Sequence, residues 1–398
     1  MVISRFLSNT AVVGLCALIF FGVPYAASAA GDLEVSGWIP YWSGTDGIHD
    51  AEKRLSVLDE IHPFSFSVKS DGTLLDLLGL DKSAWKRLIR KAEAKDVLVT
   101  PTVMTSDGAM LHALLSDPLR RTAHVASIAR MVEEGGYDGV NIDYEAKRSE
   151  TKDFFSLFLK ELKVALGNKR LSCAVEARTP PDSLYRTPPA VIEYANDYAE
   201  IGAHCDRVQI MAYDQQRADI KLNDARRGAP YMPVSDTEWV RKVVALAVQN
   251  IPKEKLVLGI PTYGYEYEVT VSPDWYQNYT RVRALNPGDA KSLARKKKVS
   301  ATRNAAGEMS FTYATTFTDK SVKSYKVPRD TTKGNTVAAQ ALAYANKTGK
   351  TTYFNIVSWS DAESIEAKVD LAEEFDLRGV AIFKIDGEED AKLWSIFR

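Results

Sequence analysis

Eight short apolar runs recur along the chain, and longer stretches with helical periodicity separate them. Aliphatic and β-branched residues dominate the runs, which is typical of parallel strands buried on both faces. The runs cover residues 35–40, 61–68, 97–103, 139–145, 171–176, 207–213, 255–261 and 378–384.

The stretches between the runs carry helix signals. Asp117 and Pro118 supply an N-cap and a first-turn proline. Phenylalanine and leucine residues form an apolar stripe over 154–166, and Ser235 with Glu238 predicts a capping box. Alternating strands and helices favour an α/β (β/α)8 TIM barrel. A doubly wound open sheet is the alternative, but no glycine-rich phosphate loop follows the first run.

One segment departs from this alternation. After Tyr263, about ninety residues precede the next long helix, which is expected near Ser364. Residues 312–317 and 353–359 alternate as antiparallel strands do, and residues 286–297 predict a helix. We therefore expect a barrel domain formed by 30–264 and 353–398, with a small α+β insertion of residues 265–352 after the seventh strand.

The first 29 residues have the pattern of a signal peptide. Arg5 precedes an apolar stretch over 11–23, and Ala27-Ser28-Ala29 is typical of a cleavage site. We expect export without stable membrane insertion after cleavage; an uncleaved anchor is the alternative.

Composition narrows the class of protein further. The 398 residues are 45% hydrophobic and 26% charged, as in globular proteins, and the formal charge is −1. This charge balance argues against a nucleic-acid-binding protein, because such a protein needs a strongly positive surface. Beyond the signal, Cys173 and Cys205 either form one bridge or are two buried thiols. The five histidines are scattered singly, which gives no zinc-binding spacing.

Candidate chemistry concentrates at the fourth run. Side chains alternate along a strand, so Asn141, Asp143 and Glu145 share one face, which we expect to point into the barrel. Two neighbouring carboxylates in a low-dielectric interior raise each other's pKa, which allows Glu145 to act as a general acid. A buried polar ladder or an ion pair is the structural alternative.

At these residues the sequence resembles glycoside hydrolase family 18, the chitinase-like barrels. Asp138, Asn141, Asp143 and Glu145 fill the motif D-x-x-D-x-D-x-E, with Asn141 in place of its second acid. The sixth run carries M-x-Y-D at 211–214, and the first run resembles the family at 37–42. The likeness is greatest to bacterial cell-wall and spore-associated members.

The resemblance implies retaining hydrolysis of a β-1,4 bond next to an N-acetylglucosamine, with the substrate's acetamido group as nucleophile. Glu145, Asp143 and Tyr213 would be the catalytic residues, and Asn141 would be a neutral hydrogen-bond partner of Asp143. No metal or other cofactor is implied. The expected substrate-binding residues are Asn141, Asp214, Met211, Trp38, Tyr41, Trp359 and Phe383. Phe383 stands where the family usually has tryptophan, which predicts a smaller stacking surface.

The expected partner is a glycan that contains N-acetylglucosamine, either a chitin oligomer or peptidoglycan. We expect the protein to be secreted or located in a bacterial cell envelope. A lectin on the same barrel is the main alternative. Because such lectins usually lose the acid, Glu145 favours the enzyme. A barrel enzyme of other chemistry would need a cofactor loop or a metal cluster.

Overall fold

The computed structural model describes residues 33–328 and 334–397. The expected signal peptide, residues 1–29, lies outside the described residues, so export and the uncleaved anchor both stay predictions. In the part of the chain that is described, no helix combines the length and the apolar character needed to cross a bilayer.

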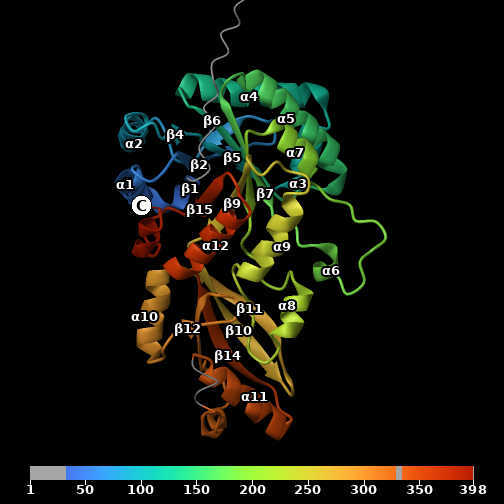
Figure 1. Cartoon of the computed structure of the whole chain (residues 1–398), viewed down its shortest axis with the longest axis vertical. Helices are drawn as coiled ribbons and strands as arrows, with labels where there is room; N and C mark the ends of the chain where they lie inside the picture. The colour runs from blue at the N-terminus through green and yellow to red at the C-terminus, as the bar shows by residue number, and fades with distance from the viewer. Residues whose placement is uncertain (1–32, 329–333, 398) are drawn as a thin grey trace, which may run out of the picture. The chain divides into compact units, whose positions relative to one another are not determined.

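Parallel strands close into an eight-membered barrel within the described chain (Figure 1). The first strand pairs with both the second and the last, which completes the ring and confirms the predicted (β/α)8 fold. In order around the ring, the strands are β1 (Glu34–Pro40), β2 (Glu60–Val68), β4 (Leu98–Val99) with β5 (Thr102–Thr105), β6 (Gly139–Tyr144), β7 (Arg170–Glu176), β8 (Arg207–Met211), β9 (Leu256–Pro261) and β15 (Gly379–Phe383).

The third strand is interrupted where Pro101, which has no N–H, cannot donate to the ladder. A short strand, β3 (Leu74–Asp76), pairs antiparallel with β2 outside the ring. These departures leave the register of β5 and β6 intact, with Met104 opposite Asp143.

Helices pack around the outside of the barrel (Figure 1). They are α1 (Gly44–Arg54), α2 (Ser83–Glu93), α3 (Gly108–Leu115), α4 (Pro118–Gly135), α5 (Lys152–Leu166), α7 (Tyr198–His204), α9 (Thr237–Ala247) and α12 (Ala362–Glu374). Two short helices, α6 (Pro181–Leu184) and α8 (Ile220–Ala225), lie in the segments that follow β7 and β8. Asp117 caps α4 as expected. The capping box at α9 was wrong: Asp236 is the N-cap, because Ser235 uses its hydroxyl to bond the Ala212 carbonyl.

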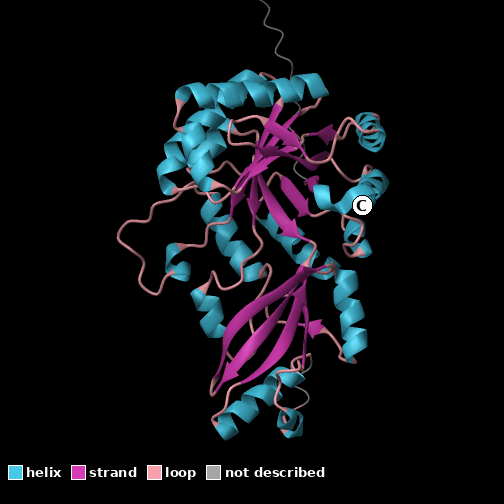
Figure 2. Cartoon of the chain, turned by 180° about the vertical axis from the view of Figure 1, so that it is seen from behind, coloured by secondary structure: helices cyan, strands magenta, loops and turns pink. Residues whose placement is uncertain are grey.

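A five-stranded antiparallel sheet follows β9 (Figure 2). Its strands, in spatial order, are β11 (Trp275–Leu285), β10 (Gly264–Ser272), β14 (Thr352–Trp359), β13 (Met309–Tyr313) and β12 (Thr302–Arg303). Its helices are α10 (Pro287–Lys297) and α11 (Thr336–Thr348). Helix α11 was not predicted. The strand β14 continues this sheet to Trp359, beyond residue 353, where the return to the barrel was expected.

The strand ends opposite the candidate site are closed by ion pairs. Glu34, the first residue of β1, accepts hydrogen bonds from Arg170, Arg207 and Arg378 at 2.7–3.0 Å. Although burial raises the pKa of Glu34, these guanidinium groups hold it at about 2. Polar groups at this end of a TIM barrel support stability, whereas chemistry belongs to the other end.

Cys173 in β7 and Cys205, which precedes β8, form a disulfide. The bridge ties two neighbouring strands of the barrel wall, and both cysteines are fully buried. Of the two alternatives left by the sequence, the structure shows the bridged one.

Candidate active site

Strand β6 divides its side chains between two environments. Val140 and Ile142 are fully buried in the apolar cluster between the strands and the helices, and the Tyr144 ring packs on Phe158 of α5. Asn141 and Asp143 alternate with them on the opposite face, inside the barrel. The polar side chains of Asn141 and Asp143 thus lie along the inner face of β6, and Glu145 comes directly after the last residue of the strand.

Asp143 and Glu145 both lie where burial raises the pKa of a carboxyl. Asp143 is 6% exposed, and its Oδ1 has no hydrogen-bond partner among the described residues. Burial, followed by the charge of Glu145, raises the pKa of Asp143 to about 8. Burial also raises the pKa of Glu145, and the charges of Glu176 and Asp214 add to this effect. The site can therefore hold a transferable proton near neutral pH.

The residues after β8 complete this cluster. Burial raises the pKa of Tyr213 well above its usual value, and the charges of Asp143, Asp214 and Glu145 raise it further. The Tyr213 phenol thus keeps its proton and is available as a hydrogen-bond donor. Asp214 adopts a positive φ of 55°, and its Oδ1 accepts hydrogen bonds from Tyr263 and Tyr265 at 2.7 Å each.

Trp38 forms a buried floor beneath these groups. It is 1% exposed, and its indole N–H donates to Asn141 Oδ1 at 3.1 Å. Asn141 also accepts a hydrogen bond from Thr102 and donates one to Gln209. The resemblance had implied a hydrogen bond from Asn141 to Asp143, but the side chain of Asn141 bonds these other neighbours instead. The role of Asn141 in the structure is to hold Trp38. Met211 packs against the same buried cluster as Trp38.

Phe383 connects this floor to an open pocket. Its ring stacks on Tyr213 with centroids 5.4 Å apart and meets the edge of Trp38 at 5.9 Å. The pocket has a volume of about 550 Å³ and is lined by Trp42, Asp214, Tyr263 and Phe383, among others. Asp143, Glu145 and Tyr213 do not line this pocket themselves; Phe383, which stacks on Tyr213, joins it to them, and its rings offer aromatic surface to a sugar.

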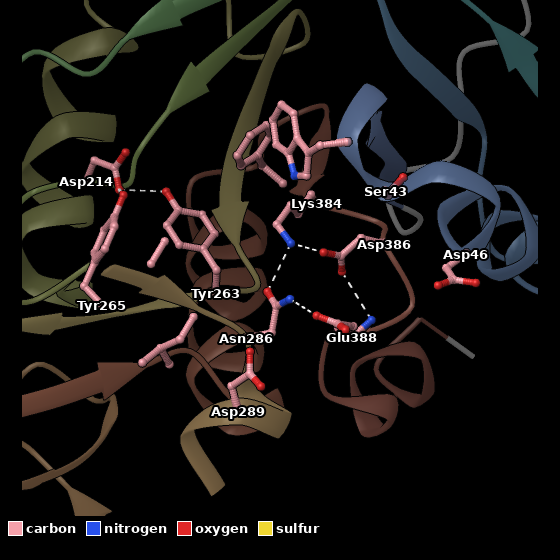
Figure 3. A pocket seen from close by; sticks show the side chains of 14 residues that line it. Ser43, Asp46, Asp214, Tyr263, Tyr265, Asn286, Asp289, Lys384, Asp386 and Glu388 are labelled. Atoms are coloured by element: carbon pink, nitrogen blue, oxygen red, sulfur yellow. Dashed lines mark hydrogen bonds and ion pairs between the residues drawn. The ribbon is translucent and has the colours of Figure 1, made fainter. Parts of the chain in front are cut away.

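Carboxylates lie on both sides of the pocket (Figure 3). Tyr263 and Tyr265 point to Asp214 on one side, and Lys384 bonds Asp386 and Asn286 on the other. Lys384 is thus already paired with an acid, and Asp46, Asp289 and Glu388 add further carboxylates to the lining. The pocket is acidic overall.

Two predicted aromatic positions lie apart from the carboxylates. Trp359 belongs to β14, is 1% exposed and packs on Phe311 in the core of the antiparallel sheet. Tyr41 is 42% exposed and stacks on Phe64, which in turn contacts Phe383. Tyr41 therefore forms an aromatic rim with Trp42 and Phe64 beside the pocket, which Trp42 itself lines. The structure does not bring Trp359 to the site.

Sequence reasoning missed Lys147 and Glu176. The Lys147 ammonium is fully buried and lies 3.6 Å from Glu176 Oε2. Glu176 ends β7, the strand beside β6, so the rule that barrel sites collect at the C-terminal ends of strands could have identified it. Lys147 gave no comparable signal, because a lysine two residues beyond a strand is ordinarily solvated.

The described part of the chain offers no evident metal centre. Residues 33–328 and 334–397 contain no group of three or more His, Cys, Asp or Glu side chains placed to hold a metal ion.

Comparison with known proteins identifies the family. The family model of glycosyl hydrolases family 18 matches residues 52–388. The chain belongs to this family. As a family 18 member with the acidic motif in place, it is a glycosidase.

Three curated relatives of this family 18 chain come from Bacillus subtilis. A protein named as a sporulation-specific glycosylase, YdhD, is 29% identical over 53% of the chain, and the match spans about half (47%) of that relative. The glycosylase YvbX is 24% identical over 73% of the chain and 70% of its own length. A cortical fragment-lytic enzyme is 23% identical over 86% of the chain and 68% of its own length.

Solved structures share the family 18 fold. The spore cortex-lytic enzyme SleL of Bacillus cereus superposes with a TM-score of 0.66 at 20% identity, covering 92% of this chain and 74% of the other. A class V chitinase from Pseudomonas fluorescens gives 0.69 at 21% identity, covering 92% and 98%.

Proposed function

We propose that this family 18 glycosidase is a secreted enzyme that hydrolyses β-1,4 bonds next to N-acetylglucosamine, with retention, in chitin oligomers or peptidoglycan. The observation that supports it most is the pair of carboxyls at the end of β6: Asp143 is buried, burial raises the pKa of both Asp143 and Glu145, and the charges of both act on Tyr213. One carboxyl can deliver a proton while the other, with the phenol, organises the reacting group.

In the first step, Glu145 gives its proton to the glycosidic oxygen as the bond to the anomeric carbon breaks. The substrate's acetamido oxygen forms the new bond to that carbon, which yields an oxazolinium ion and the free leaving sugar. Tyr213 donates a hydrogen bond to the acetamido oxygen and holds it in line for attack.

Asp143 faces the positive charge that develops on the acetamido group. An adjacent positive charge favours the carboxylate form, so the pKa of Asp143 falls as the intermediate forms. In the second step, water attacks the anomeric carbon and the oxazolinium ring opens. Glu145, now ionised, takes the proton of that water and is ready for another cycle.

Two observations support a glycan rather than a small substrate. The aromatic rim formed by Tyr41, Trp42 and Phe64 continues from Phe383, and flat apolar rings suit the faces of consecutive pyranoses. Relatives are named as cortical fragment-lytic enzymes and as chitinases, which supports chitin oligomers and peptidoglycan as the substrates to compare.

The anomer of the first product tests the mechanism. Proton NMR of chitin oligosaccharide hydrolysis should show the β-anomer first and the α-anomer only after mutarotation. A thiazoline derived from N-acetylglucosamine, which imitates the oxazoline intermediate, should inhibit competitively. An α-anomer formed first would contradict participation of the acetamido group.

A further inference from the structure

Glu145 lies on a turn whose backbone is held from both sides. Its own N–H donates to the Thr105 carbonyl on β5 at 2.9 Å. The next N–H, that of Ala146, donates to Glu176 Oε1 at 3.1 Å, which comes from β7 on the other side of β6. Ala146 adopts a positive φ of 51°, a conformation that is unfavourable for an alanine, so the turn needs such support.

The second carboxylate oxygen of Glu176 is also engaged. Glu176 Oε2 accepts from Asn196 at 2.7 Å and lies 3.6 Å from the Lys147 ammonium. Glu176 therefore contacts the chain at Ala146 and at Lys147, the two residues that follow Glu145. A single side chain from the neighbouring strand thus fixes the exit of β6.

Lys147 is an unusual neighbour for a proton donor, because its ammonium group is buried. The Nζ donates to the Tyr144 carbonyl and lies 4.6 Å above the Phe155 ring. Burial lowers the pKa of Lys147, whereas the charges of Glu176, Asp143 and Glu145 raise it. The ammonium therefore acts on both catalytic carboxyls as well as on its ion-pair partner.

The charged groups around Glu145 come from three segments. Glu176 on β7 and Asp214 after β8 raise the pKa of Glu145, and Lys147 lowers it. Two of these groups act on Asp143 in the same directions: Glu176 raises its pKa and Lys147 lowers it. Removing the charge of either Glu176 or Lys147 should therefore shift the pKa values of Asp143 and Glu145 in the same direction.

We propose that Glu176 and Lys147 are positioning residues for Glu145: Glu176 fixes the turn that carries the Glu145 side chain, and the pair balances the charge that this side chain faces. The proposal rests on the proposed function, in which Glu145 is the general acid. A purely structural ion pair would stabilise the fold without setting the pH range in which Glu145 holds its proton.

Three variants separate position from charge. Glu176→Gln keeps an oxygen for the Ala146 N–H but removes the negative charge, so the alkaline limb of the kcat/KM profile should move to lower pH. Lys147→Met removes the positive charge and suits the apolar contact with Phe155, so the limb should move to higher pH. Each displacement should be about one pH unit, as expected for a charge several ångströms away at an intermediate dielectric. Glu176→Ala also removes the support of the turn, and its maximal kcat should fall about tenfold or more with KM little changed.

Glu150→Gln and Lys152→Met are matched controls, because both residues are exposed and their ion pairs lie on the surface. Neither control should move the limb. Displacement of the limb in the same direction by Glu176→Gln and Lys147→Met, or no displacement by either, would overturn the proposal.

A measurement that needs no turnover keeps this proposal separate from the proposed function. Protein labelled with ¹³C at glutamate carboxyls can be titrated by NMR, with the Glu145 signal assigned by its loss in Glu145→Gln. The Glu145 midpoint should fall in Glu176→Gln and rise in Lys147→Met. If these shifts occur while no glycan is cleaved, the proposed function fails and the charge balance stands; if cleavage occurs without the shifts, the reverse holds.

Discussion

Replacing Asp143 by asparagine should stabilise the folded protein at alkaline pH while impairing catalysis. The pKa of Asp143 is raised by burial and by Glu145 from an ordinary value of 3.8 to about 8. The folded protein therefore retains a proton that the unfolded chain has already released, so the stability of the wild type falls as pH rises between these values. Over three pH units, from 5 to 8, this loss amounts to about 4 kcal/mol.

The amide of the Asp143→Asn variant has no titrating proton, so the variant should escape that loss. Urea unfolding of the wild type and Asp143→Asn at pH 5, 6.5 and 8 should show a difference in unfolding free energy that shifts toward the variant by about 4 kcal/mol across the range. Asp153→Asn, at an exposed position of α5, is the control and should show no such trend. A difference between variant and wild type that is the same at all three pH values would refute the burial argument.

Three further changes have expected outcomes. Tyr213→Phe should lower kcat about 10- to 100-fold with a modest change in KM, measured with chitin oligosaccharides, because the phenol acts on the reacting acetamido group; an unchanged kcat would remove Tyr213 from the mechanism. Phe383→Ala should raise KM about fivefold, since the ring that stacks on Tyr213 and faces the pocket is lost; an unaltered KM would mean that sugars do not stack there. Replacing Cys173 and Cys205 together by alanine should lower the unfolding free energy by about 3–4 kcal/mol for a bridge over 32 residues, as read from thermal unfolding, and an unchanged Tm would contradict this.

The barrel was predictable because each parallel strand is buried on both faces and reads as an apolar run. The predicted runs overlap the strands of the ring, and the alternation along 139–145 placed Asn141 and Asp143 on the interior face correctly. The helix α11 was missed because its buried positions are mainly small alanines, which give a weak apolar stripe.

Pairwise contacts across strands were harder to foresee. Alternation puts Asn141 and Asp143 on one face, but it does not show that Trp38 from β1 and Gln209 from β8 reach Asn141 first. Trp359 was expected near the sugar because an aromatic ring can stack on a pyranose, yet its strand belongs to the antiparallel sheet and its indole packs in that sheet's own core. The buried ammonium of Lys147 depends on Glu176 from the neighbouring strand, which no local pattern around Glu145 records.

The most direct test of the account compares the wild type with Glu145→Gln on chitin oligosaccharides and on purified peptidoglycan. Glutamine keeps the shape of the side chain but has no proton to donate, so cleavage should fall about 10²- to 10⁴-fold while glycan binding persists. The glycan that the wild type cleaves identifies the substrate. Binding without cleavage by both proteins would contradict the account and would make this chain a lectin on a hydrolase barrel.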